Sequence, residues 1–194
     1  MENKTIFTRS ATVDIRNMMR EVVTEEPGLI ADTRVDVEIL KNHLMKAKIS
    51  MPSAGAEFTI FSDEPPIIGG EGAAPLMFGY FMAGTLLCEC AQYIWNAAQL
   101  ELIDSISSLK MSIEGGFPIA PLYGMDDTKG EARVKEMKVT TTIEGDASPE
   151  QIEELARLAV RRCPAHQTIL NPTPYVNVVV LNGNKIAEFR DADR

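Results

Sequence analysis

The chain has 194 residues, a length that suits one domain with one sizeable hydrophobic core. Hydrophobic residues make up 45% of the sequence and charged residues 24%, close to the averages for globular proteins, which argues against a disordered or coiled-coil protein. The formal net charge is −9 and no block of Lys or Arg interrupts it, so we expect no nucleic-acid partner and no membrane surface.

The N-terminus and the cysteines suggest the cellular compartment. The first ten residues lack the apolar segment and the small-residue cleavage site of a secretory signal. The longest nearly uncharged apolar run, residues 73–88, is too short to span a bilayer. Three cysteines without such a signal favour a reducing compartment, so we expect a cytoplasmic protein with free thiols.

The first half of the chain begins with a predicted amphipathic helix over residues 12–26. Its apolar stripe, at helical spacing, consists of Ile15, Met18, Met19, Val22 and Val23. Alternating or β-rich runs then predict three strands of an antiparallel meander, at residues 35–39, 44–49 and 58–61. Residues 62–74, SDEPPIIGGEGAA, are predicted to form a loop because prolines and glycines interrupt any regular element.

A long apolar helix is predicted from about Pro75 to Gln99, with the proline in its first turn. Apolar residues occupy almost every side of this helix, which predicts burial almost all round. In a chain of this size, such burial usually needs a partner subunit or a sheet wrapped around the helix.

The second half is predicted to alternate strands and helices. Strands are expected at residues 109–114 and 135–144, and a closing hairpin at 175–181 and 185–189 around an Asn-Gly turn. Ser148 and Gln151 form a capping box that starts a helix. The predicted fold class is therefore α+β, with antiparallel sheets.

Cys163 is the most informative single residue. Pro164 is favoured at the first position of a helix, which places Cys163 at the N-cap of a short helix. Free backbone N–H groups and the helix dipole at that position favour a thiolate. His166 lies three residues further on, where it either tunes Cys163 or covers the helix. The alternative is a small buried core thiol.

Cys88 and Cys90 both lie on the long predicted helix. At 100° per residue they point about 200° apart, so they cannot form a disulfide with each other, and any bridge must join one of them to Cys163. The alternative is again two buried core thiols. Two histidines without nearby cysteine pairs make no metal site, and the sequence holds no nucleotide-binding motif, so we expect no metal and no cofactor.

Three short stretches are informative through their order and spacing. They are residues 63–66 with Gly69-Gly70 and Pro75, residues 100–102 leading into 109–115, and residues 143–146 followed by a helix, Cys163-Pro164 and Asn171-Pro172. Together these stretches resemble the OsmC/Ohr family of thiol peroxidases. The likeness covers about residues 35–190, and residues 1–34 resemble an N-terminal extension of one branch, which together make a single OsmC-like domain over 1–194.

The resemblance implies a fold, an assembly and a reaction. The fold is an intertwined homodimer in which six-stranded antiparallel sheets wrap around long buried central helices. A cysteine on the central helix attacks an organic hydroperoxide, and a second cysteine in a Cys-Pro motif resolves the product as a disulfide. A dithiol such as a dihydrolipoyl group then reduces the pair.

This sequence matches one family cysteine and departs at the other. Cys163 matches the resolving position, whereas counting from Pro75, and back from residues 100–102, places Leu86 in the slot of the attacking cysteine. Leu76 and Met77 stand where the family has a carboxylate. The nearest acids are Glu64 and Glu71, and Lys41 and Lys46 are the cations near the strand expected to carry an activating arginine.

Two functional hypotheses follow. The first is a thiol-dependent organic hydroperoxide reductase that uses Cys90 and Cys163, with Cys88 as the alternative thiol. The second is a catalytically degenerate homologue that binds a small apolar ligand at the dimer interface. Its predicted pocket is lined by Leu76, Phe78, Leu86 and His166, close to Cys90.

Overall fold

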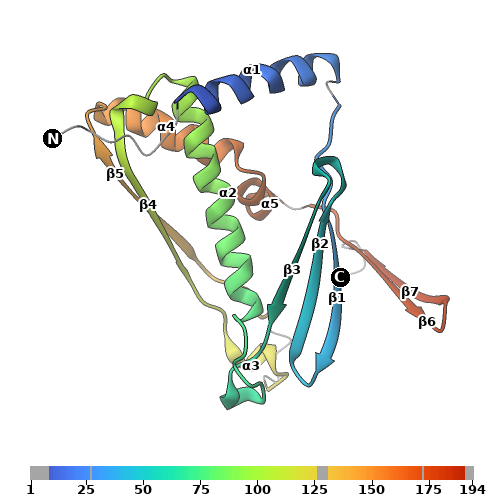
Figure 1. Ribbon diagram of the computed structural model, residues 1–194. Coiled ribbons are helices and arrows are strands. Elements are labelled where there is room, and N and C mark those ends of the chain that lie inside the picture. The colour runs from blue at the N-terminus through green and yellow to red at the C-terminus, as the bar shows by residue number, and fades with distance from the viewer. Residues whose placement is uncertain (1–8, 27, 126–130, 172, 191–194) are drawn as a thin grey trace.

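The computed structural model describes residues 9–26, 28–125, 131–171 and 173–190. Its longest helix, α2, runs through the middle of the molecule, with strands β1–β3 on one side and strands β4 and β5 on the other (Figure 1). Helices α4 and α5 pack against α2. The predicted α+β class with antiparallel sheets is confirmed.

The N-terminal third forms one helix and one sheet. Helix α1 (Arg9–Glu25) is followed by the antiparallel strands β1 (Arg34–Lys41), β2 (Leu44–Met51) and β3 (Ala56–Ser62), in the order β1-β2-β3. Asn42 takes a positive φ of 52° in the turn between β1 and β2, a conformation that Asn tolerates better than most residues. The predicted meander is therefore confirmed.

The segment between β3 and α2 is tied to both elements. It contains one turn of 3-10 helix, η2 (Pro66–Ile68), within the predicted loop. The Ser62 hydroxyl donates to the Pro75 carbonyl over 2.9 Å, and the Tyr80 hydroxyl donates to the Phe61 carbonyl over 2.7 Å. These bonds fix the start of α2 (Met77–Gln99) against the end of β3.

The second half of the chain covers one side of α2. Strands β4 (Ile106–Gly115) and β5 (Met137–Gly145) form a two-stranded antiparallel sheet, with the short helix α3 (Ile119–Leu122) between them in the chain. Helix α4 (Pro149–Arg162) starts at the predicted capping box, in which Ser148 and Gln151 bond each other's backbone N–H groups.

The C-terminal elements are a helix and a hairpin. Helix α5 (Pro164–Leu170) starts directly after α4, with Cys163 as its N-cap, as predicted. Strands β6 (Val176–Leu181) and β7 (Asn184–Arg190) pair as the predicted hairpin, with positive φ at Asn182 and Gly183. This hairpin projects away from the other elements (Figure 1).

The hydrophobic core lies at the C-terminal half of α2. It is formed by residues of α2, of the α2–β4 connection, of the start of β4 and of α4: Tyr93, Ala97, Ala98, Leu102, Ile103, Ile106, Leu155 and Ala159. The short 3-10 helix η3 (Ile103–Ser105) belongs to this cluster. The core therefore holds the end of α2 against α4, just before Cys163.

The predicted burial of α2 almost all round is not reached within the single chain. Only one face is buried, and it carries Thr85, Glu89, Tyr93, Asn96, Ala97 and Ala98. Leu87 points away from that face and is 71% exposed, and the Phe81 side chain is also exposed. The second face stays open because no element of the described chain covers it.

Strand β1 and helix α1 also expose their apolar residues. All eight residues of β1 are exposed, although alternation predicted a half-buried strand. Met18, Met19 and Val23 of the predicted α1 stripe are exposed as well. The seven described strands form three separate sheets, so the six-stranded sheet implied by the resemblance is not formed within one chain.

Candidate functional site

Cys163 lies at the junction between α4 and α5. The proline at position 164 begins α5 and leaves Cys163 in an extended conformation as the N-cap. The backbone N–H of His166 donates to the Cys163 Sγ over 3.4 Å. The residue is fully buried, so its thiol faces the protein interior rather than solvent.

The helix cysteine that meets Cys163 is Cys88. The Cys88 thiol lies close enough to Cys163 to raise the pKa of Cys163, and both thiols are free in the structure. Cys90 points about 200° away from Cys88 around α2, so it cannot face the same thiol. The structure thus brings Cys88, rather than Cys90, to the Cys-Pro cysteine.

Leu86, the position that the resemblance assigns to the attacking cysteine, stays a prediction. Leu76 is extended and α2 begins at Met77, so Pro75 lies before the helix rather than in its first turn. The thiol of α2 that lies beside Cys163 is two residues after Leu86, at Cys88. The side chain opposite Cys163 is therefore a thiol.

The surroundings of Cys163 and Cys90 are unfavourable to thiolate. Burial raises the pKa of Cys163, and the nearby Cys88 thiol raises it further, while the His166 N–H lowers it. Burial, followed by the adjacent Glu89 carboxylate, raises the pKa of Cys90. Cys163 and Cys90 therefore both favour the neutral thiol.

Glu89 connects α2 to α5 beside the thiol pair. Its side chain is buried, and its Oε2 lies 3.1 Å from the His166 Nδ1. A buried carboxylate without a partner is costly, so this contact fixes where α5 sits on α2. The His166 side chain keeps 23% of its surface exposed and lines a cavity of about 260 Å³ with Thr85 and Ile169.

Arg162 makes the corresponding connection on the other side of Cys163. Its guanidinium donates to the side-chain oxygens of Asn96 and Gln99, both on α2. Asn96 is buried, and its amide also donates to the Gln92 carbonyl over 2.7 Å. Residues on both sides of Cys163 are thus bonded to α2.

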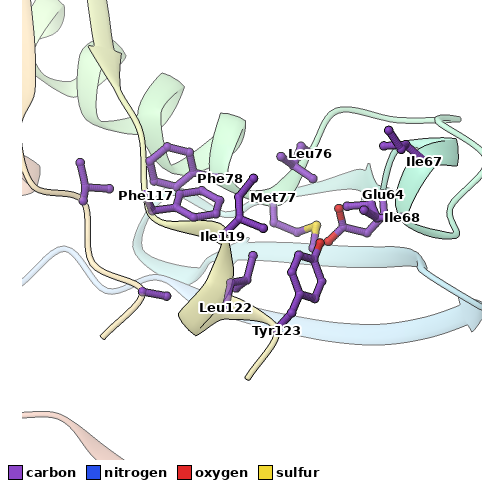
Figure 2. A pocket seen from close by; sticks show the side chains of 12 residues that line it. Glu64, Ile67, Ile68, Leu76, Met77, Phe78, Phe117, Ile119, Leu122 and Tyr123 are labelled. Carbon is purple, nitrogen blue, oxygen red and sulfur yellow. The ribbon is translucent and has the colours of Figure 1, made fainter. Parts of the chain in front are cut away.

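A second feature is an apolar pocket at the N-terminal end of α2, with a volume of about 530 Å³. Its walls come from the loop before α2, from the first turn of α2 and from the segment around α3 (Figure 2). The lining is almost entirely apolar and includes Ile67, Ile68, Leu76, Met77, Phe78, Phe117, Ile119 and Leu122. Among the described residues of this lining, Glu64 is the one carboxylate.

Asp63 organises the loop that forms one wall of the apolar pocket. Its carboxylate is buried and accepts the backbone N–H groups of Glu64, Glu71 and Ala73 over 2.9 to 3.0 Å. These bonds, led by the one from Ala73, hold the pKa of Asp63 below its usual value despite burial. The loop is therefore built around one ionised side chain.

The predicted pocket residues are divided between the two cavities. Leu76 and Phe78 line the apolar pocket, whereas His166 lines the smaller cavity beside Glu89. Leu86 lines neither of these two cavities. The candidate cations are paired with acids: Lys41 with Glu71 over 2.7 Å, and Lys46 with Glu38.

Within the described ranges, no group of three or more His, Cys, Asp or Glu side chains is arranged to hold a metal ion. None of the helices in this part of the chain has the length and apolar character needed to cross a membrane.

The comparisons with known proteins agree with the fold. The family model described as OsmC-like protein matches residues 70–178, so the chain belongs to the OsmC-like protein family. An OsmC-like protein from Mycoplasma pneumoniae has a similar structure, with a TM-score of 0.55, 18% identity, and coverage of 75% of this chain and 90% of that chain. An organic hydroperoxide resistance protein OsmC from Legionella pneumophila gives a TM-score of 0.51, 18% identity, and coverage of 73% and 90%. No curated protein matches the chain.

Sequence reasoning missed the roles of Glu89, Arg162 and Asp63. One signal for Glu89 was present, since an acid in the middle of an apolar helix must find a partner if its face is buried. Asp63 precedes a Pro-Pro and Gly-Gly loop with many unpaired N–H groups, which is a setting that suits a carboxylate. Neither signal identifies the partner by itself.

The lowered pKa of Asp63 predicts a pH-dependent stability. Because the folded-state pKa is below the unfolded one, Asp63 stabilises the protein above the unfolded value, about 3.9, and this contribution is lost as pH falls through the folded-state pKa. Asp63→Asn should therefore lower the urea midpoint at pH 7, and the gap to wild type should narrow as pH falls below the unfolded value. Exposed Glu114→Gln serves as the control, and a gap independent of pH would contradict the prediction.

The contact between Glu89 and His166 predicts an energetic coupling. His166→Ala leaves a buried carboxylate without this partner and should lower the free energy of unfolding by about 1–3 kcal/mol. Adding Glu89→Leu removes the unpaired charge. The double variant should therefore lose less free energy of unfolding than the two single variants lose together. Urea unfolding of the wild type, the two single variants and the double variant measures this difference.

The matched control for this cycle replaces Glu153, an exposed acid on α4, by leucine in the same His166→Ala background. For that pair the changes in the free energy of unfolding should be additive. If the changes for Glu89 and His166 were additive as well, the contact would not hold α5 on α2.

Proposed function

We propose that this OsmC-like protein is a thiol-dependent peroxidase that reduces organic hydroperoxides with Cys88 and Cys163. The observation that carries the proposal is the proximity of the Cys88 thiol to the buried Cys163 thiol. The solved structure from Legionella pneumophila bears the name organic hydroperoxide resistance protein, which supports the choice of substrate class. Cys88 takes the place of Cys90 in the pair expected from the sequence.

In the first step Cys88 is the nucleophile. Cys88 is partly exposed, whereas Cys163 is fully buried and its raised pKa favours the neutral thiol. The Cys88 thiolate attacks the outer oxygen of the hydroperoxide, the O–O bond breaks, and the alkoxide takes a proton and leaves as the alcohol. The sulfur of Cys88 is oxidised to a sulfenic acid.

In the second step Cys163 resolves the sulfenic acid. Its sulfur loses a proton and attacks the Cys88 sulfur, the S–O bond breaks, and the departing hydroxide takes a proton and leaves as water. The product is an intramolecular disulfide. A dithiol of the dihydrolipoyl type, in a cytoplasmic compartment, then returns both thiols and is itself oxidised to a disulfide.

The functional unit in this proposal is a homodimer. Apolar side chains are exposed on β1, on the β6–β7 hairpin and on the open face of α2, including Val37, Ile39, Val178, Phe189 and Leu87. A two-stranded hairpin is marginally stable alone, and exposed apolar surface of this extent marks interaction sites. A second copy of the chain would cover these surfaces and complete the small sheets.

The redox proposal predicts one specific disulfide. Treating the reduced protein with a stoichiometric organic hydroperoxide should join Cys88 to Cys163, because these thiols lie close together. Peptide mapping by mass spectrometry under non-reducing conditions identifies the bridge. A dithiol should then restore both thiols.

Two variants separate the roles of the cysteines. Cys88→Ser should abolish hydroperoxide turnover, whereas Cys90→Ser should retain it and still form the bridge. If Cys88 and Cys163 stay reduced while methionines become oxidised, or if the bridge contains Cys90, the assignment of this pair fails.

The homodimer proposal predicts a dissociable assembly. Light scattering after gel filtration should give about twice the chain mass for the wild type. Val178→Lys should shift the protein toward monomer, because it places a charge on an apolar strand proposed to be covered. Thr142→Lys adds the same charge at an exposed polar position of β5 and serves as the control. A monomeric wild type at micromolar concentration would exclude the dimer.

The apolar pocket favours a second candidate function, the binding of an apolar ligand. Its volume of about 530 Å³ lies within the usual range for small-molecule sites, about 300–1,000 Å³. This function needs no cysteine, so a Cys88→Ala, Cys163→Ala variant should bind ligand as the wild type does. The ligand-binding experiment described in the next subsection tests it.

A further inference from the structure

The Glu64 carboxylate is placed where an apolar ligand would leave it unpaired. Its Oε2 is buried and has no hydrogen-bond partner among the described residues. Glu64 lines the apolar pocket, and Figure 2 shows its carboxylate on the same side as the Tyr123 ring, with Phe78 and Phe117 across the pocket. A purely apolar occupant would keep this oxygen away from water and would offer it no hydrogen.

The backbone of Glu64 is held firmly. Its N–H donates to the Asp63 Oδ1 over 2.9 Å, and its carbonyl accepts the Gly72 N–H over 3.1 Å. A Cβ added at Gly70 would lie 1.8 Å from the Glu64 carbonyl oxygen, so the loop is closely packed at this point. The side chain therefore extends from a fixed backbone position, which lowers the entropic cost of binding.

The charged groups Asp63 and Lys41, near this site, already have hydrogen-bond partners. The Asp63 carboxylate is occupied by three backbone N–H groups, and Lys41 is paired with the exposed Glu71. No Lys or Arg belongs to the described lining of the pocket. The described part of the pocket wall therefore presents one negative group in an apolar surface, which disfavours an anionic ligand and favours a cationic one.

We propose that the apolar pocket binds an amphiphile with a protonated amine at one end, and that Glu64 accepts the hydrogen bond from this ammonium group. This inference rests on the second candidate function and adds the chemical class of the ligand. A volume of about 530 Å³ equals roughly 18 water-sized groups, which suits a chain of about ten to twelve carbons. The ammonium supplies both the charge and the hydrogens that Glu64 lacks.

The experiment compares three ligands of one chain length: dodecylamine, dodecanol and dodecanoate. Titration calorimetry below their micellar concentrations, at pH 7, measures binding to the intact protein in its Cys88→Ala, Cys163→Ala form. The amine is protonated at this pH, as a lysine side chain is. Dodecylamine should bind at least tenfold more tightly than dodecanol, and dodecanoate should bind most weakly.

Variants at Glu64 test the role of the carboxylate. Glu64→Gln should weaken dodecylamine at least tenfold and leave dodecanol unchanged. Glu64→Lys should reverse the preference, so that dodecanoate binds more tightly than dodecylamine. Glu71→Gln, a change of the same kind at an exposed acid of the same loop, should leave all three ligands unaffected.

The outcomes distinguish the inference from the function on which it rests. If dodecanol and dodecylamine bind equally and Glu64→Gln changes neither, the pocket binds apolar ligands but the amine class is excluded. If none of the three ligands binds, the inference and the second candidate function both fail. The proposed peroxidase function of Cys88 does not depend on either result.

Discussion

Two buried polar side chains on α2 decide where Cys163 lies. Glu89 and Asn96 face the interior, where each would be costly without a hydrogen-bond partner. Their partners are His166 and Arg162, which stand on either side of Cys163 in the chain. Because both neighbours are hydrogen-bonded to α2, the thiol between them faces that helix as well. The residue of α2 beside this thiol is Cys88. The proposed redox pair is thus positioned by the satisfaction of two polar groups.

Local signals in the sequence are sufficient to predict the helices and strands and to place one of the two proposed redox cysteines, Cys163. The capping box at Ser148, the Asn-Gly turn and the position of Pro164 each determine backbone geometry within a few residues, and each of these predictions is confirmed. For the same reason the sequence alone places Cys163 at a helix N-cap. Periodicity also predicts α2, but an apolar residue on every side gives no information on which side is covered.

The other half of the site depends on contacts between distant residues. Helical geometry shows that only one of Cys88 and Cys90 can face Cys163, but the choice depends on how α5 docks, which Glu89 and His166 determine across 77 residues. Leu86 stays the position that the resemblance assigns to the attacking cysteine, and the thiol beside Cys163 lies two residues after it, at Cys88. The exposed apolar residues of β1 have no explanation within the chain.

The open face of α2 relates the two candidate functions to each other. Phe78 at the apolar pocket and Cys88 at the thiol pair are ten residues apart, which is about 15 Å along the helix. Within one chain, a ligand seated at the pocket is therefore remote from the thiols. The surface between them includes exposed Phe81 and Leu87, which need a cover of apolar character. A second copy of the chain, which we propose for this surface, would also decide whether the apolar pocket of one protomer opens toward the thiol pair of its partner. The connection between binding and redox chemistry is thus a property of the assembly rather than of the single chain.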